Sequence, residues 1–191
     1  MPDSTERLKD LIAYMDGTRA ALCALARAVD PAFASIRPHS GSWSATEVVA
    51  HLALVEQSVA RLVAKAIEKA RAEGVGPETS AESVMSSLDN FSVIEPLQKL
   101  DAPEKMIPVA EVSLDESLDS LERSRAILRN AIVEGADIAL STITRPHMRL
   151  GELNVLQWAL FVAQHEERHR MQIERTLNEV AELAAESAPI V

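Results

Sequence analysis

The sequence predicts an all-α protein, a four-helix bundle with a long crossover between helices two and three. The composition indicates helix, because only 3% of the residues are aromatic and only 6 of the 191 are glycine. Four segments repeat apolar residues at steps of three and four, which is the spacing of one helical face. A chain of this length with 47% hydrophobic residues forms one core, so we expect a single domain over residues 1–191.

The first two helices have clear ends. Helix one is predicted over about 4–29, and Asp30-Pro31 ends it, because proline disfavours helix in the residue before it. Helix two is predicted to begin near Ser44, since Ser44 and Glu47 have the spacing of a capping box. Gly74 marks its end.

The segment 74–112 lacks helical spacing and contains several prolines, with a short helix expected near 81–88. We interpret it as a crossover that lets helix three begin at the same end of the bundle as helix two. Helix three is predicted over about 113–134. Helix four follows over about 152–185, after a loop that contains Arg145-Pro146-His147.

Charge and hydropathy exclude several classes of protein. The net charge of −10 and the lack of basic clusters argue against a nucleic-acid or anionic-membrane partner. No apolar stretch approaches the roughly 20 residues that span a bilayer, and the charged N-terminus does not resemble a signal peptide. Cys23 is the only cysteine, which excludes an internal disulfide and favours a cytoplasmic location. We interpret Cys23 as a small core residue.

Two histidines stand where the buried face of helix four should be apolar. That face reads Val155, Trp158, Val162, His165, His169 and Ile173. Residues four apart on a helix lie about 5–6 Å from each other, so both imidazoles can approach one atom. An unpaired imidazole in a dry core costs about 1–3 kcal/mol, and coordination of a metal ion would remove that cost.

His51 on helix two is the candidate third ligand. It lies beside an apolar stripe, about two turns from the start of its helix. The alternative for all three histidines is that they are core residues whose nitrogens are hydrogen-bonded to other side chains. His39 and His147 are predicted to lie in loops, and we assign them no role.

The segment from His165 to His169 also matches H-E-x-x-H, a zinc-peptidase signature in which the glutamate polarises the attacking water. In such a peptidase Glu166 would be the catalytic base. The other possibility is a solvated surface position, since the next residue on a helix points about 100° away. The longer signature requires residues other than Gln172 and Arg175, and no convincing strand precedes the motif to hold a peptide.

Three further side chains are candidates for the site. Arg125 interrupts the apolar stripe of helix three, so it needs either a buried carboxylate or an anionic substrate as partner. Glu47 precedes His51 by one turn and either orients its ring or only caps the helix. Gln172 follows His169 by three residues, where its amide can hydrogen-bond within the site.

Several motifs together resemble the DinB-like (DinB/YfiT) family of four-helix-bundle metalloenzymes. The similar segments are Ser42 to Leu52, Pro146-His147, the Gly151-Glu152-Leu153-Asn154 entry to helix four, Trp158, and the H-x-x-x-H-x-x-Q-I ending from His165 to Ile173. The resemblance extends over nearly the whole chain. One departure is the Met148-Arg149-Leu150 spacer before Gly151, where relatives often place glycine sooner.

The resemblance implies a divalent transition metal held by His51, His165 and His169, in a bacterial protein that forms a homodimer. Ligand type alone fits zinc, nickel, iron or manganese. A metal-dependent enzyme acting on a small molecule is the first functional hypothesis, with thiol-transferase-like chemistry and a low-molecular-weight thiol as co-substrate. A non-catalytic metal-binding or stress-related bundle is the second hypothesis. The peptidase is the third.

Overall fold

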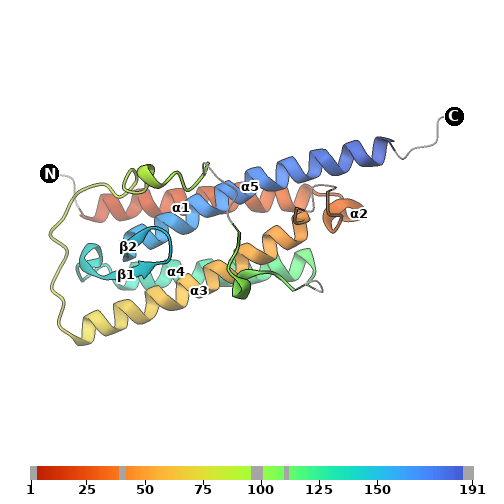
Figure 1. Ribbon diagram of the computed structural model, residues 1–191. Coiled ribbons are helices and arrows are strands. Elements are labelled where there is room, and N and C mark those ends of the chain that lie inside the picture. The colour runs from red at the N-terminus through yellow and green to blue at the C-terminus, as the bar shows by residue number, and fades with distance from the viewer. Residues whose placement is uncertain (1–3, 39–41, 96–100, 110–111, 187–191) are drawn as a thin grey trace.

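The computed structural model describes residues 4–38, 42–95, 101–109 and 112–186, and it confirms the predicted helical bundle (Figure 1). The long helices are α1 (Ser4–Ala28), α3 (Ala45–Ala72), α4 (Leu114–Glu134) and α5 (Val155–Glu186). A one-turn helix, α2 (Pro31–Ala34), follows α1, because the Asp30 carboxylate caps it and proline is suited to a first helical position.

Capping boxes start both central helices. The Ser44 side chain accepts from the Glu47 N–H and Glu47 accepts from the Ser44 N–H, as predicted. Ser113 and Glu116 form the same reciprocal pair at the start of α4. These bonds satisfy backbone donors that have no partner inside the helix, so they set where each helix begins.

The four long helices form two parallel pairs (Figure 1). α1 and α5 run in one direction, and α3 and α4 run in the other. α3 packs mainly on α4, and α1 packs mainly on α5. α4 therefore begins at the same end of the bundle as α3, which confirms the predicted crossover.

The crossover itself differs from the prediction in one respect. Residues 81–88 form turns rather than a helix, and the short 3-10 helices η1 (Asp89–Phe91) and η2 (Glu104–Met106) lie further on. The Ser80 and Ser83 hydroxyls accept hydrogen bonds from backbone N–H groups two residues onward. Such local bonds compete with helix formation.

A second correction concerns the start of α5. The expected loop is an antiparallel hairpin of β1 (Thr144–His147) and β2 (Gly151–Asn154), with Thr144 opposite Asn154 and His147 opposite Gly151. The expectation that no strand precedes the histidine motif is therefore wrong. α5 begins at Val155 rather than near 152, because Asn154 and Gln157 exchange side-chain-to-backbone bonds of 2.9 and 3.0 Å.

A layer of charge divides the core of the bundle. Its members are Arg19 of α1, Glu56 of α3, Arg125 of α4 and Glu166 of α5, all buried. Each lies between two apolar clusters. On α3, for example, Leu52 belongs to one cluster and Val59 to the other, with Glu56 between them. Within the described residues, no helix has both the length and the apolar composition that crossing a membrane requires.

Candidate metal centre

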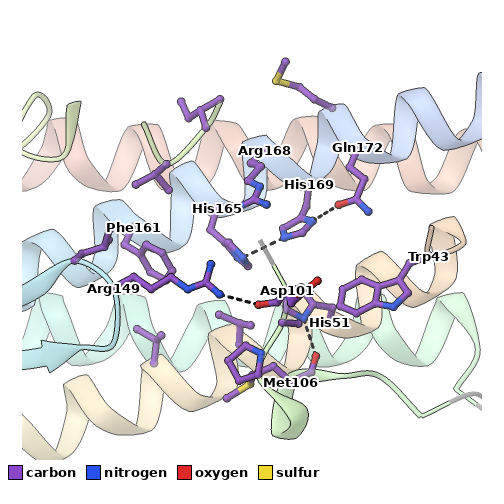
Figure 2. Close-up of a pocket in the computed structure, with 18 of the residues that line it drawn as sticks. Trp43, His51, Asp101, Met106, Arg149, Phe161, His165, Arg168, His169 and Gln172 are labelled. Atoms are coloured by element: carbon purple, nitrogen blue, oxygen red, sulfur yellow. Dashed lines mark hydrogen bonds between the residues drawn. The ribbon is translucent and has the colours of Figure 1, made fainter. Parts of the chain in front are cut away.

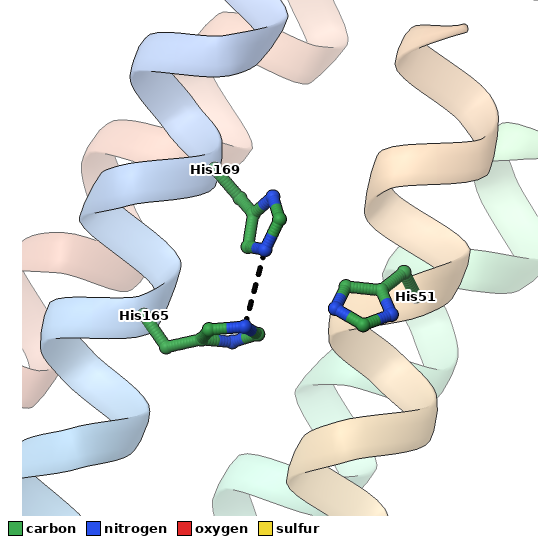
Figure 3. A group of neighbouring side chains, drawn as sticks. All are labelled: His51, His165 and His169. Atoms are coloured by element: carbon green, nitrogen blue, oxygen red, sulfur yellow. Dashed lines mark hydrogen bonds between the residues drawn. The ribbon is translucent and has the colours of Figure 1, made fainter. Parts of the chain in front are cut away.

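Helices α3 and α5 bring three histidines together on the wall of a cavity (Figure 2). His51 extends from α3, and His165 and His169 extend from consecutive turns of α5 (Figure 3). One ligand nitrogen from each ring lies within 4.8 Å of the other two. The sequence was compatible with the three histidines lying close together, and the packing of α3 against α5 brings them together.

Backbone and amide oxygens fix the tautomers of two rings. His51 Nδ1 lies 2.7 Å from the Met106 carbonyl oxygen, and His169 Nδ1 lies 2.7 Å from Gln172 Oε1. Both oxygens only accept, so each Nδ1 carries the proton and each Nε2 keeps its lone pair. This is the arrangement found around metal-bound histidines, where an outer oxygen orients the ring.

The spacing of the rings fits a metal ion. His165 Nε2 donates a hydrogen bond of 3.1 Å to His169 Nε2, because the proton of His169 is on Nδ1. Two nitrogens on a tetrahedral zinc ion are about 3.3 Å apart, so an ion could replace the shared proton. The ring of His51 lies 5.3 Å from that of His165 and 5.0 Å from that of His169, between centroids. Small side-chain rotations would therefore bring all three nitrogens to one ion.

All three imidazoles are neutral at physiological pH. Burial lowers the pKa of His51 and takes the pKa of His169 to about 3. Burial also holds the pKa of His165 well below its ordinary value, and the neighbouring imidazoles act in the same direction. Metal coordination requires the neutral form, which burial favours for all three rings.

The cavity has a volume of about 1170 Å³ and opens beside the three rings (Figure 2). Trp43 packs against His51 at 4.9 Å, and Phe161 stacks on His165 at 5.4 Å, between ring centroids. The crossover contributes Met106 and Asp101 to the wall. The segment that appeared structureless in the sequence thus helps to build the site.

Arg168 also lines this cavity, between the two histidines of α5. Its guanidinium lies near the imidazoles in Figure 2. Burial lowers the pKa of Arg168, and the positive charges of Arg149 and Arg175 lower it further. Arg168 in turn depresses the pKa of all three histidines. Sequence reasoning assigned it no role.

His147 is a second residue that sequence reasoning missed. Its Nδ1 accepts hydrogen bonds from the N–H groups of Arg149 and Leu150, both at 3.1 Å, so its Nε2 carries the proton. Its ring contacts Phe161 and lines the cavity. The Pro146-His147 motif was the available signal. His39 lies outside the described residues.

Two sequence candidates lie in the charged layer instead of the cavity wall. Glu166 is 1% exposed, and its oxygens accept from Arg19 Nε at 2.6 Å and Arg125 Nη2 at 2.9 Å. Neither of the two positions considered for Glu166 is observed, because it is not solvated and its carboxylate is not aimed at the three histidines. Arg125 pairs with Glu56 and Glu166. Of the two partners considered for Arg125, the structure therefore shows buried carboxylates and not an anionic substrate.

Of the two remaining candidates, Gln172 contacts a histidine of the site and Glu47 does not. Gln172 hydrogen-bonds His169 as expected. Glu47 caps α3 and pairs with Arg37, while the Met106 carbonyl takes the position beside His51 that Glu47 was a candidate for. Burial raises the pKa of Cys23 to about 11, so its thiol stays protonated in the core.

Comparison with known families agrees with this architecture. The family model described as the DinB superfamily matches residues 14–173. The chain belongs to the DinB superfamily. One similar solved structure is the crystal structure of TT2238, a four-helix bundle protein, at 27% identity and a TM-score of 0.59. The alignment covers 88% of this chain and 98% of that one. A search of curated proteins gave no match.

Proposed function

We propose that this DinB-superfamily protein binds a divalent transition metal ion through His51, His165 and His169 and catalyses a metal-dependent reaction on a small molecule. The observation that carries the proposal is the cluster itself: three imidazole nitrogens within 4.8 Å, beside a cavity of about 1170 Å³. Three neutral imidazoles can hold zinc, nickel, iron or manganese, and ligand type alone does not select one of them.

Among the described residues the cluster offers three ligands, which would leave a position on the ion open and supports catalysis rather than a structural role. Structural zinc sites have four protein ligands, whereas catalytic sites have three and leave room for water or substrate. When bound, such an ion lowers the pKa of a coordinated water or thiol toward neutrality. The Met106 carbonyl and Gln172 orient the rings, and Trp43 and Phe161 shield two of them from water.

We further propose transferase-like chemistry in which a low-molecular-weight thiol is the co-substrate. The size of the cavity supports this, because its volume of about 1170 Å³ lies just beyond the upper end of the roughly 300–1,000 Å³ of ordinary ligand sites. The homodimer implied by the resemblance and the cytoplasmic location favoured by the single cysteine stay predictions; light scattering tests the first.

A zinc-peptidase mechanism has little support in this geometry. It needs the Glu166 carboxylate beside the metal-bound water. That carboxylate is buried and bonded to Arg19, Arg125 and the Thr18 hydroxyl.

Elemental analysis of purified protein tests the proposal. After exposure to zinc, nickel, iron(II) or manganese salts, we expect about one ion per chain for the native protein and for His147→Ala, the cavity-lining control. The double variant His165→Ala/His169→Ala should fold, by circular dichroism, but bind no ion. Absence of stoichiometric metal from the native protein with every salt would refute metal binding. Full metal loading without turnover of any thiol-dependent substrate would leave a non-catalytic bundle.

A further inference from the structure

We infer that the small molecule bound at this site is an anion, and that Arg168 pairs with its oxyanion group while another of its groups reaches the three-histidine metal position. This inference rests on the proposed metal site, because it assigns the class of ligand that the site accepts. It gives a specific role to a residue that helix packing alone does not explain.

Arg168 is the feature that carries the inference. Its side chain is half-buried in the cavity wall, yet among the residues that the structure describes no hydrogen bond or ion pair holds its guanidinium. The other arginines of the interior are paired: Arg19 and Arg125 each contact Glu56 and Glu166. The N–H donors of Arg168 are not enclosed in the core, so they are free to pair with an oxyanion in the cavity.

The charges that act on Arg168 are those of two other arginines, Arg149 and Arg175. Neutral imidazoles cannot cancel the two charges of a divalent ion, and Arg149 and Arg175 add positive charge to the same cavity. Three carboxylates line the cavity as well, those of Glu95, Asp101 and Glu179. These three residues are exposed, as are Arg149 and Arg175, so the charged side chains of the cavity wall balance and the two charges of the ion remain to be compensated. An anionic ligand would lower the electrostatic energy of this site.

The guanidinium also defines the kind of anion. Its planar set of N–H donors matches a carboxylate or a phosphate, either of which it binds through two parallel hydrogen bonds. Arg168 lies one turn from His165 and lines the same cavity as all three histidines, so metal and guanidinium would face one small molecule (Figure 2). The ligand class is thus a small molecule with a metal-binding group at one end and an oxyanion at the other.

Paired thiols that differ in charge test this inference. Cobalt(II)-loaded protein would be titrated with mercaptoacetate, its longer homologue 3-mercaptopropionate, and neutral 2-mercaptoethanol, following the visible absorption of the cobalt–thiolate complex. We expect the better of the two anionic thiols to bind at least about tenfold more tightly than the neutral one. Equal affinities for the neutral and anionic thiols in the native protein would overturn the inference.

Two substitutions on neighbouring positions assign the effect. Arg168→Gln should abolish the preference for the anionic thiol. Arg170→Gln should keep it, because Arg170 pairs with Glu167 and Glu174 and does not line the cavity. A preference that survives in Arg168→Gln would overturn the role of Arg168. Lack of a cobalt spectrum in the native protein would instead refute the metal site itself, so the two failures are distinguishable.

Discussion

At the scale of single residues, the neutral imidazoles make stability depend on pH. His169 titrates at about 3 when folded, against an ordinary value of 6.5. Above pH 6.5 it is neutral in both states. Below that, the unfolded chain binds a proton that the folded chain does not, so the free energy of unfolding falls as pH falls toward 3. The slope reaches up to about 1.4 kcal/mol per pH unit for each such histidine.

Urea unfolding of the metal-free protein between pH 7 and pH 4, in the presence of a chelator, measures this slope. Several carboxylates titrate in the same range, so the informative quantity is the difference between the native protein and His169→Gln. The variant should lose stability less steeply as the pH falls. Parallel curves for the two proteins would show that His169 is not held neutral by burial.

Sequence reasoning reached the ligands more easily than their partners. His165, His169 and Gln172 share one helix, so their periodicity brings them together whatever the rest of the fold does. Met106 cannot be found that way, because it contributes a backbone carbonyl from a segment that is 55 residues from His51 in the chain. Backbone oxygens carry no signature in a sequence, and neither does a cavity that only packing creates.

At the scale of elements, the entry to α5 determines where its histidines lie. The sequence revealed the Ser44–Glu47 capping box but not the equivalent bonds between Asn154 and Gln157. The hairpin before them escaped prediction as well. Its strands have four residues each, and one contains Pro146, so alternation of apolar residues had too little length to appear.

Removal of the Asn154 cap at the start of α5 should destabilise the protein. Asn154→Ala should lower the free energy of unfolding by about 1 kcal/mol, because the Gln157 N–H loses its acceptor at the helix start. Asn130→Ala makes the same change at an exposed position inside α4 and should be neutral or slightly stabilising. Equal effects of the two substitutions in urea unfolding would argue against the cap.

At the scale of the whole molecule, the charged layer ties all four long helices together. The sequence marked only Arg125 as anomalous, because Arg19, Glu56 and Glu166 are residue types that helix surfaces normally carry. Which charged residues point into the core depends on how the four helices pack together. The sequence of any one helix therefore does not predict it. The two glutamates balance the two arginines, so loss of one partner leaves a buried charge uncompensated.

Glu166→Gln separates the two roles available to the glutamate of the H-E-x-x-H segment. In the charged layer, the substitution leaves Arg19 and Arg125 with one carboxylate between them and should cost about 3–5 kcal/mol. Metal content, by elemental analysis, should stay at the native level, because the carboxylate is not directed at the histidines. Glu167→Gln, one residue onward and paired with Arg170 near the surface, should cost less than about 1 kcal/mol. A catalytic glutamate predicts the opposite result for Glu166→Gln, with stability retained and chelator-sensitive peptide cleavage lost.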